Sequence, residues 1–390
     1  MSSPTPSFSP ELAKLRGMSI LITGGCGFIG SHCVEVCHAL GMDVYVFDNM
    51  ASGHTVLSPT SSKSASITYI YGDICNGVAF RNLPSHIDFV IHLAAAISVV
   101  ESMTNPAKYH AVNVEGSNNV FEYAIGAGAK AVVSASSAAF YGDCGTEAIT
   151  ETYPYQGISP YADSKMTMEC LGEACNQRQS QTRFFFCRFF NVYGPRQDPS
   201  SPYTGVISIF MECCRSKKPI TIFGDGQQTR DFIFVRDVVA GCLSILSGAS
   251  ALKLSENAFN VGTGKSVTIN RLAELVIAAS GVKPEETPIM HCERRAGDIR
   301  DSLSCCNRLK TSCSWNPSVE LGNGLKTTWN WFTNQADGLM GDLTQVDHEK
   351  LRSQGILIFN VDECLLKEMR ISPTTATIQQ VSAIGSATHA

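Results

Sequence analysis

The stretch Ser19-Ile-Leu-Ile-Thr-Gly-Gly-Cys-Gly-Phe-Ile-Gly30 decides the fold of this chain. Its apolar beginning predicts a short buried strand. Three glycines, Gly24, Gly27 and Gly30, follow at G-x-x-G-x-x-G spacing, and a helix is predicted directly after this turn, over 28–40. Glycine amides at the start of a helix let a pyrophosphate approach the positive end of the helix dipole. The sequence therefore predicts the phosphate-binding turn of a dinucleotide fold.

Strands and helices are predicted to alternate along the chain. A long helix is predicted to begin at Pro160, because Ser159 offers a capping oxygen to its first amides. Such alternation is typical of an α/β protein with a doubly wound parallel sheet, a Rossmann-type fold. The predicted strands are 19–22, 44–47, 67–71, 89–93, 131–134 and 182–188, and the predicted helices are 28–40, 107–125 and 160–179.

Composition excludes several classes of function. The chain has 390 residues, 44% of them hydrophobic, and a net charge of −5, which gives no reason to expect a nucleic-acid partner. No apolar run reaches the ~18–20 residues of a membrane span, and the Ser/Pro-rich start does not resemble an export signal. We therefore expect a soluble, cytoplasmic protein. The sixteen cysteines lack CxxC or zinc-finger spacing, so reduced thiols and no metal are expected.

The residues that follow the predicted strands favour NAD as the cofactor. Asp48 ends the second strand about twenty residues after the glycine turn, where a carboxylate binds the ribose hydroxyls and repels a 2′-phosphate. Asp73 follows the third strand and can reach the adenine edge, although capping a turn is an alternative role. His92 ends the fourth strand and is more typical of a structural histidine than of a catalyst. The predicted NAD contacts also include Phe28, Ile29, Asn49, Ile74, Leu93, Ala94 and Ala95.

The chain is expected to divide into four segments. Gly194-Pro195 and Pro219 interrupt the regular pattern after about residue 190, and regular packing is expected to end near Phe332. The expected segments are a mobile leader (1–17), an NAD-binding Rossmann domain (18–190), a smaller mixed α/β part that mainly binds substrate (191–333), and an extra, partly disordered tail (334–390).

Three residues form a candidate catalytic group. Tyr161 and Lys165 are four residues apart on the predicted helix and share one face. A phenol has an ordinary pKa near 10, and a nearby ammonium together with the positive nicotinamide ring favours the phenolate. Ser137 follows the fifth strand, at the carboxyl edge of the sheet where ligands bind. Tyr161 is therefore predicted to act as a base, with Ser137 on the same substrate oxygen.

The order of these motifs resembles the extended short-chain dehydrogenase/reductase family, in particular its NAD-dependent nucleotide-sugar epimerases and dehydratases. UDP-glucose and UDP-N-acetylglucosamine 4-epimerases are the nearest members. The resemblance runs from about Ser19 to Phe332. Besides the glycine turn it includes Val112-Asn-Val-Glu-Gly116, Ser136-Ser137, Tyr161-Ala-Asp-Ser-Lys165, Arg188-Phe-Phe-Asn-Val-Tyr-Gly-Pro-Arg196, Gly224-Asp-Gly-Gln-Gln-Thr-Arg-Asp231 and Arg295-Ala-Gly-Asp298.

The resemblance implies further contacts and an oligomeric state. Asn113 and Ser136 would lie beside NAD, and a homodimer would form through a four-helix bundle that includes the Tyr161 helix. The implied UDP-sugar contacts are Asn191 for the sugar nucleotide, Thr221 and Phe223 for the uracil, Arg230 and Arg295 for the diphosphate, and Asp298 and Ser302 near the sugar.

The residues after the catalytic serine distinguish the reactions of this family. Ala138 and Ala139 stand where its dehydratases carry an acidic pair and its decarboxylases a glutamate. Epimerisation through a transient 4-keto sugar is therefore predicted. A UDP-glucuronate 4-epimerase or another nucleotide-sugar epimerase/dehydratase is one alternative. A catalytically silent NAD-binding sensor is another, against which the intact Ser137, Tyr161 and Lys165 set argues.

The size of one residue bears on the substrate. In the 4-epimerases of this family, a bulky side chain shortly after the Arg-x-Gly-Asp motif excludes an N-acetyl group at the sugar C2. That position is Ser302 in this chain, which is small. We therefore hypothesise that UDP-N-acetylhexosamines are accepted as well as, or in preference to, UDP-glucose and UDP-galactose.

Overall fold

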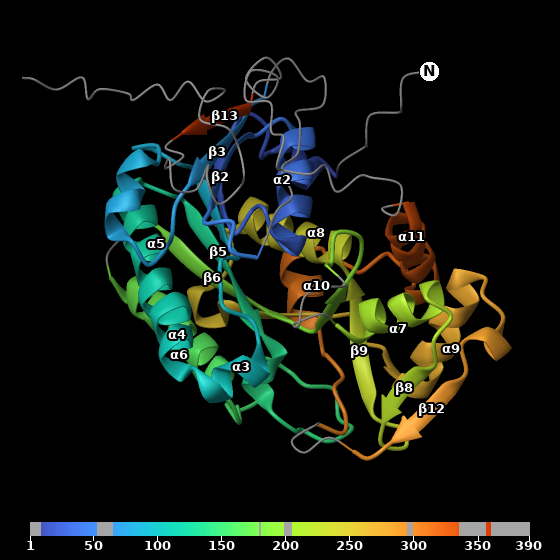
Figure 1. Ribbon diagram of the computed structural model, residues 1–390. Helices are drawn as coiled ribbons and strands as arrows, with labels where there is room; N and C mark the ends of the chain where they lie inside the picture. Colours follow the sequence, from blue (N-terminus) through green and yellow to red (C-terminus); the bar gives the residue numbers. More distant parts are fainter. Residues whose placement is uncertain are drawn as a thin grey trace, which may run out of the picture.

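A parallel sheet of eight strands forms the larger part of the molecule (Figure 1). The computed structural model describes residues 9–52, 65–178, 181–198, 205–294 and 299–334 and the backbone of 356–359. Every neighbouring pair of strands in the order β10-β6-β5-β4-β1-β2-β3-β13 is parallel. The order reverses between β1 and β4, where such sheets bind ligands. The strands are β1 Ser19–Thr23, β2 Asp43–Asp48, β3 Ile67–Tyr71, β4 Phe89–His92, β5 Ala131–Ser137, β6 Arg183–Phe189, β10 Ala258–Val261 and β13 Ile356–Phe359.

Helices cover both faces of this sheet, because its inner strands are apolar on both sides. Ile20 and Ile22 of β1 pack in the core that includes α2 (Phe28–Leu40) and α8 (Val235–Gly248). Leu21 points the other way, into the core that includes α5 (Ser117–Gly126) and α6 (Pro160–Gln177). The shorter helices are α1 Pro10–Ala13, α3 Val99–Thr104, α4 Pro106–His110 and α10 Asn307–Cys313, with 3-10 turns at η1 Gly77–Asn82, η3 Ala138–Tyr141, η4 Leu254–Glu256 and η5 Pro284–Glu286.

A smaller part is built on two further sheets and has a core of its own. Phe210, Leu272 and Leu325 are buried together there, one from each of three helices. The strands β7 (Asn191–Tyr193), β9 (Thr229–Phe234) and β11 (Ser266–Thr268) form one sheet, and β8 (Ile220–Phe223) pairs with β12 (Ile289–Cys292) in the other. The helices are α7 Val206–Arg215, α9 Ile269–Ser280 and α11 Leu321–Asn334. In Figure 1 these elements lie together on the right.

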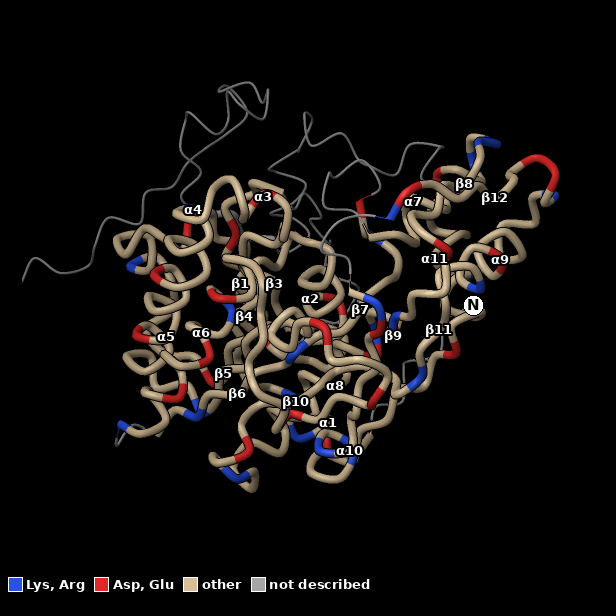
Figure 2. The backbone as a smooth tube through the Cα atoms, turned by 90° about the horizontal axis from the view of Figure 1, so that it is seen from below, with Lys and Arg blue, Asp and Glu red and all other residues tan. Residues whose placement is uncertain are grey.

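The predicted α/β fold with a doubly wound parallel sheet is confirmed. The helices predicted to begin at 28 and at Pro160 begin at those residues, and Ser159 accepts a hydrogen bond from the amide of Ala162 at 3.2 Å. Within the described residues no helix is long and apolar enough to cross a membrane. Lys and Arg are interspersed with Asp and Glu over both parts (Figure 2).

Three features differ from the sequence prediction. The single helix predicted over 107–125 is interrupted by a π-helical turn, η2 (Ala111–Gly116), where Ser117 donates a hydrogen bond to the carbonyl of Asn113 at 2.6 Å. The apolar run at 355–359 forms β13, which pairs with β3. Finally, α8 and β10 fall within the segment 191–333 but pack on or in the larger sheet, so that segment builds both parts.

Candidate active site

The glycine turn between β1 and α2 is shaped to hold a phosphate group. Gly24 has φ +69°, and a Cβ there would lie 2.7 Å from the amide of Ala94. A Cβ on Gly30 would lie 2.1 Å from the Gly24 carbonyl oxygen, so only glycine fits. Gly27 caps α2 without any side-chain hydrogen bond. The first amides of α2 are thus left for an anion, and the turn fits the pyrophosphate of NAD.

Asp48 lies against this turn. Its carboxylate accepts hydrogen bonds from the amides of Cys26 at 2.9 Å and Met50 at 2.8 Å. Asn49 donates to Asp73 at 3.0 Å, and Asp73 also accepts from the amide of Cys75 at 2.8 Å. The turn-capping role considered for Asp73 is therefore present. Because β2 and β3 are neighbours, all three predicted residues lie at the same edge of the sheet.

The end of β4 is held by a buried polar chain. His92 hydrogen-bonds Thr23 Oγ1 at 2.7 Å and Ser117 Oγ at 2.9 Å, and burial lowers the pKa of His92 to about 3. A neutral histidine with both ring nitrogens hydrogen-bonded has a structural role. The same Thr23 hydroxyl accepts from the amides of Leu93 at 3.2 Å and Ala94 at 3.3 Å. These hydrogen bonds fix the loop after β4, which is predicted to contact NAD.

Asn113 holds the next residues of that loop. Its side chain accepts from the amide of Ala96 at 2.8 Å and donates to the Ala96 carbonyl at 2.9 Å and to Ser164 at 2.9 Å. The residue is fully buried. Asn113 therefore joins the loop after β4 to α6. Ile74, also predicted near NAD, is buried in the core beside η2, where its carbonyl accepts from Asn119 at 2.9 Å.

Ser137, Tyr161 and Lys165 are brought together as predicted. Ser137 ends β5. Burial raises the pKa of the Tyr161 phenol, and the hydrogen bond with Ser137 opposes part of this rise. Lys165 is 4% exposed and donates to the Ala135 carbonyl at 2.8 Å. Burial lowers the pKa of Lys165 to about 8, and the charge of Glu169 opposes this shift. The arrangement can take a proton from a hydroxyl placed between Ser137 and Tyr161.

Two residues of this neighbourhood had no predicted role. Glu169 and Arg188 form a buried ion pair beside Lys165, with Arg188 Nη2 2.6 Å from a Glu169 oxygen. The hydroxyl of Ser136, a residue predicted to lie beside NAD, donates a hydrogen bond to Glu169. The spacing of Glu169, one helical turn after Lys165, was the available signal.

The predicted sugar-nucleotide residues lie in the smaller part. Asn191 begins β7 and is exposed, and β7 pairs with β9, which carries Arg230. The Arg230 guanidinium donates to the carbonyls of Thr229 at 2.7 Å and Ile299 at 2.8 Å. Thr221 and Phe223 are on β8. Arg295 and Asp298 lie outside the described residues.

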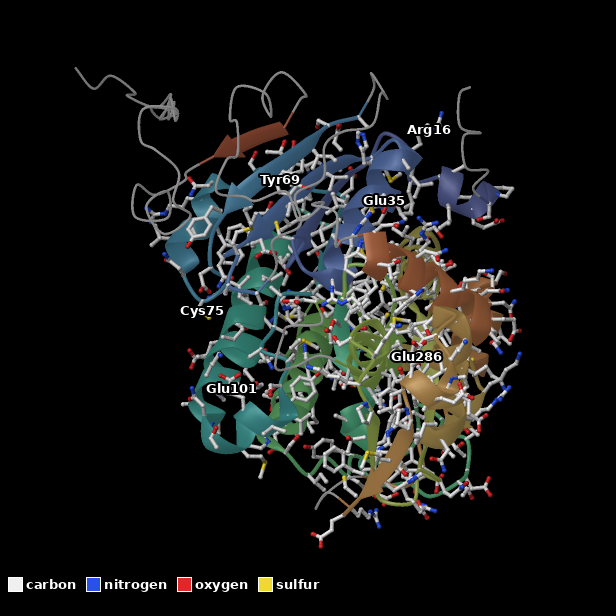
Figure 3. The ribbon with its side chains drawn as sticks, turned by 45° about the vertical axis from the view of Figure 1, so that its right-hand side comes forward. Arg16, Glu35, Tyr69, Cys75, Glu101 and Glu286 are labelled. Atoms are coloured by element: carbon white, nitrogen blue, oxygen red, sulfur yellow. The ribbon has the colours of Figure 1, made fainter. Side chains whose placement is uncertain are left out.

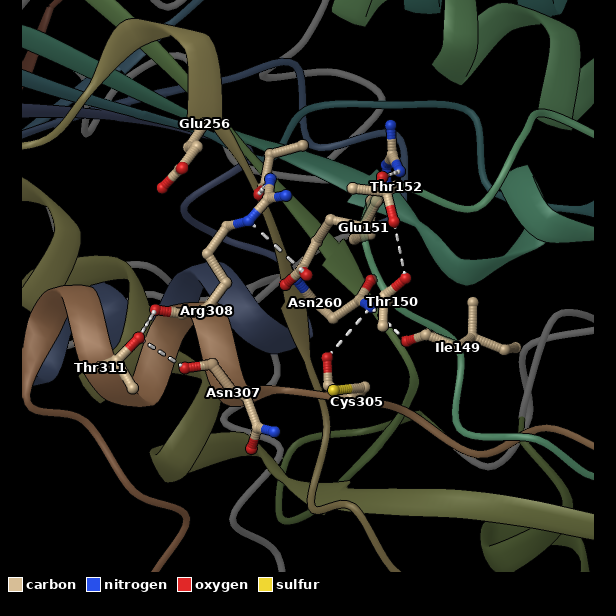
Figure 4. A network of polar contacts seen from close by, with 12 residues as sticks. Ile149, Thr150, Glu151, Thr152, Glu256, Asn260, Cys305, Asn307, Arg308 and Thr311 are labelled. Atoms are coloured by element: carbon tan, nitrogen blue, oxygen red, sulfur yellow. Dashed lines mark hydrogen bonds and ion pairs between the residues drawn. The ribbon is translucent and has the colours of Figure 1, made fainter.

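Ser302 belongs to a segment that is fixed to the larger part. Asn260 donates to the carbonyls of Ile149 at 2.7 Å and Cys305 at 3.2 Å, and its own amide donates to Glu151 at 2.9 Å (Figure 4). Asp231 accepts from the amide and hydroxyl of Ser304 on the same segment. Ser302 is 5% exposed. The residues just after Ser302 are therefore held by Asn260 of the larger part and Asp231 of the smaller part.

A second junction joins α2 to the segment after β7. Arg196 donates to Glu35 at 2.7 Å, and His32 hydrogen-bonds the Pro195 carbonyl at 2.8 Å. Glu35, labelled in Figure 3, lies on α2. The helix that begins at the glycine turn is thus connected directly to the loop that follows Asn191 and Tyr193.

Comparison with known proteins agrees with this geometry. The NAD dependent epimerase/dehydratase family matches residues 20–262, and the chain belongs to that family. The predicted enzyme class and the predicted cofactor, NAD, are thereby confirmed.

Three relatives illustrate the similarity. The UDP-glucose 4-epimerase of Mycolicibacterium smegmatis is 33% identical over 327 residues, covering 82% of this chain and 100% of that protein. The solved UDP-N-acetylglucosamine 4-epimerase from Methanobrevibacter ruminantium M1, in complex with UDP-N-acetylmuramic acid, is 31% identical with a TM-score of 0.74, covering 82% and 99% of the two chains. The solved UDP-glucose 4-epimerase of Thermus thermophilus, in complex with NAD, is 31% identical with a TM-score of 0.70, covering 81% and 99%.

Proposed function

We propose that this protein is an NAD-dependent 4-epimerase of UDP-sugars. It would interconvert UDP-glucose and UDP-galactose, UDP-N-acetylglucosamine and UDP-N-acetylgalactosamine, or both pairs. The observation that carries the proposal is the cluster of Ser137, Tyr161 and Lys165 at the carboxyl edge of the sheet, followed by two alanines. Similarity to 4-epimerases of both kinds of UDP-sugar supports it.

The catalytic group performs proton transfer at one sugar oxygen. NAD, when bound at the glycine turn, would supply the hydride acceptor and donor for the sugar C4. Tyr161, as a phenolate, takes the C4 hydroxyl proton on its Oη and later returns it. Ser137 orients the same oxygen, and the ammonium of Lys165 stabilises the phenolate. Burial lowers the pKa of Lys165 to about 8, which is still above neutral pH, so the ammonium form predominates there.

The absence of side-chain chemistry beside Ser137 restricts the reaction. Ala138 and Ala139 begin the turn η3 and carry no acid or base. Elimination of water across C5 and C6 requires such a group, whereas return of hydride to a ketone does not. The ring of the 4-keto sugar is therefore expected to rotate in the site, after which the ketone is reduced.

The smaller part holds the nucleotide while the sugar turns over. Arg230 and Arg295 bind the diphosphate, because a guanidinium matches the geometry of phosphate oxygens. Asn191 contacts the sugar nucleotide, Thr221 and Phe223 lie along the uracil, and Asp298 lies near the sugar. Anchoring only the nucleotide leaves the sugar free to present either face.

Ser302 permits an N-acetyl group in this proposal. Its small side chain leaves room beside the sugar C2, so conversion of UDP-N-acetylglucosamine is expected together with, or in preference to, conversion of UDP-galactose. Mass spectrometry and chromatography of products from both substrates test this. Conversion of UDP-galactose alone would contradict the proposed breadth but not the 4-epimerase activity.

Replacing the base is the direct test of the mechanism. Tyr161→Phe removes the phenol and is expected to lower kcat by about 10²–10⁴-fold while bound NAD is retained. Tyr155→Phe is a matched control, because the Tyr155 hydroxyl bonds Asp163 on the outer face of α6. Turnover that survives Tyr161→Phe would overturn the proposed mechanism.

The family resemblance also supports a homodimer. We infer that α6 takes part in a four-helix bundle between two copies of the chain. The mass in solution, measured by light scattering, is expected to be twice that of the 42.0 kDa chain, and a monomer would contradict the inference.

A further inference from the structure

The face of α6 that carries Tyr161 and the buried Lys165 also carries a second buried residue, Glu169. These three residues are spaced by four, so they follow one another along a single helix face. Glu169 is 8% exposed, and its carboxylate accepts hydrogen bonds from Arg188 Nε at 2.9 Å and Nη2 at 2.6 Å. A charged group at this depth must be paired, and Arg188 on β6 provides the pair.

Three consecutive residues of β5 contact the three residues of this helix face. The Ala135 carbonyl accepts from Lys165, the Ser136 hydroxyl donates to Glu169, and Ser137 hydrogen-bonds Tyr161. Glu169 therefore fixes the register of α6 against β5 at the residue next to the catalytic serine.

Arg188 is held in turn by groups beyond the catalytic helix. Its Nη1 donates to the Tyr141 hydroxyl at 2.9 Å and to the Glu151 carbonyl at 3.2 Å, and its guanidinium lies 3.6 Å from the Phe140 ring centroid. Tyr141 donates to Asn260 at 2.6 Å, and burial raises the pKa of Tyr141 to about 12, so it stays neutral. The ion pair is thus also held by Phe140 and Tyr141 of η3 and by the Glu151 carbonyl.

The charges around Lys165 make Glu169 its principal electrostatic partner. On α6 the ionisable neighbours of Lys165 are Tyr161 and Glu169. On β4 the neighbour is His92, which is neutral. Arg188 on β6 is paired with Glu169. The β5 neighbour is the uncharged Ala135 carbonyl. While Tyr161 is neutral, Glu169 is the one among these described groups whose charge favours the ammonium form of Lys165 against the effect of burial.

We propose that Glu169, clamped by Arg188 and Ser136, is a positioning residue that keeps Lys165 charged and holds Tyr161 against Ser137. Neither Glu169 nor Arg188 needs to touch the substrate or NAD for this role. The proposal rests on the proposed function of Tyr161 and Lys165.

The pH profile of Glu169→Gln tests this role. The glutamine keeps the shape and one acceptor but removes the charge, so Lys165 is expected to lose its proton at lower pH. In the pH profile of kcat, the fall at alkaline pH is expected near pH 8 in the natural chain. In the variant this alkaline limb should move to lower pH by about one pH unit. Glu173→Gln is the matched control, with the same change of charge one turn further along α6, where Glu173 accepts from Asn257. Equal alkaline limbs in the two variants would overturn the proposal.

Changes at Arg188 complete the test. Arg188→Lys keeps the positive charge and is expected to leave the alkaline limb in place while kcat falls, because the two-pronged hold on Glu169 is lost. If Glu169→Gln does not fold, the double change Glu169→Gln with Arg188→Met decides. It removes both charges of the buried pair, so the alkaline limb should again move to lower pH, and an unmoved limb contradicts the proposal. Turnover that survives Tyr161→Phe would instead contradict the proposed function itself.

Discussion

The two parts of the molecule each contain an arginine that meets a carboxylate in two-pronged geometry, but they bury it differently. In the larger part, the Arg188 and Glu169 side chains are 7% and 10% exposed. In the smaller part, Arg300 meets Asp225 at 2.8 and 3.1 Å with side chains 42% and 57% exposed. The same contact is thus buried beside the candidate catalytic residues in one part and exposed to water in the other.

The difference extends to some of the residues predicted to bind ligands. Asn113 and Lys165 of the larger part have partners within the protein itself. In the smaller part Arg230 is held by the carbonyls of Thr229 and Ile299, whereas Asn191 on β7 and Thr221 on β8 are exposed. Catalytic groups fixed in advance avoid reorganisation during the reaction, whereas nucleotide contacts need only bind.

The largest effect that sharpens this comparison is expected at the glycine turn. Gly30→Val adds a branched side chain whose Cβ would lie 2.1 Å from the Gly24 carbonyl oxygen. The backbone must move, at a cost of about 1–3 kcal/mol, and the cradle for the pyrophosphate is lost. The purified variant is expected to contain no NAD and to show no turnover.

A glycine in open space provides the control for that change. At Gly248, on the last turn of α8, a Cβ would meet nothing within 4 Å, so Gly248→Ala should leave NAD content and turnover intact. If Gly30→Val retained NAD as well as this control does, the turn would not be the cofactor site.

The fold and the catalytic trio could be predicted from the sequence because they depend on local patterns. Gly24, Gly27 and Gly30 have a fixed spacing between a strand and a helix, and Tyr161 and Lys165 have a fixed spacing within one helix. The register of α6 on β5 follows from neither. It requires Ser136 to meet Glu169 and Arg188 to reach Glu169 from β6, which are contacts between residues far apart in the chain.

Other features depend on interactions that the sequence pattern does not indicate, such as side-chain hydrogen bonds to the backbone. The helix predicted over 107–125 contains the π-helical turn because the Ser117 hydroxyl takes the Asn113 carbonyl, and the Asn113 side chain is drawn to Ala96. Likewise, β13 was not predicted, because a short apolar run after a long polar segment gives no indication of which strand it pairs with.

An intermediate effect is expected at the diphosphate. Arg230→Ala removes a charged group from β9, and hydrogen bonds to charged groups contribute about 1.5–3 kcal/mol. KM for the UDP-sugar is therefore expected to rise by about 10–100-fold, with a smaller change in kcat and no change in NAD content. Steady-state kinetics on UDP-galactose measures both constants. A fall in kcat with an unchanged KM would assign Arg230 to the catalytic step and erase the contrast between the two parts.

The smallest effect is expected at the exposed pair. Arg300→Ala breaks the contact with Asp225, but both side chains remain in water, and such surface pairs contribute little. The Tm is expected to change by less than about 2 °C and KM to stay as it is. Arg188→Ala, measured beside it, should cost about 3–5 kcal/mol of stability, because it leaves the Glu169 carboxylate buried without its partner. If the two variants lowered the Tm equally, burial would not be what separates the two ion pairs, and the smaller part would be as rigidly organised as the larger.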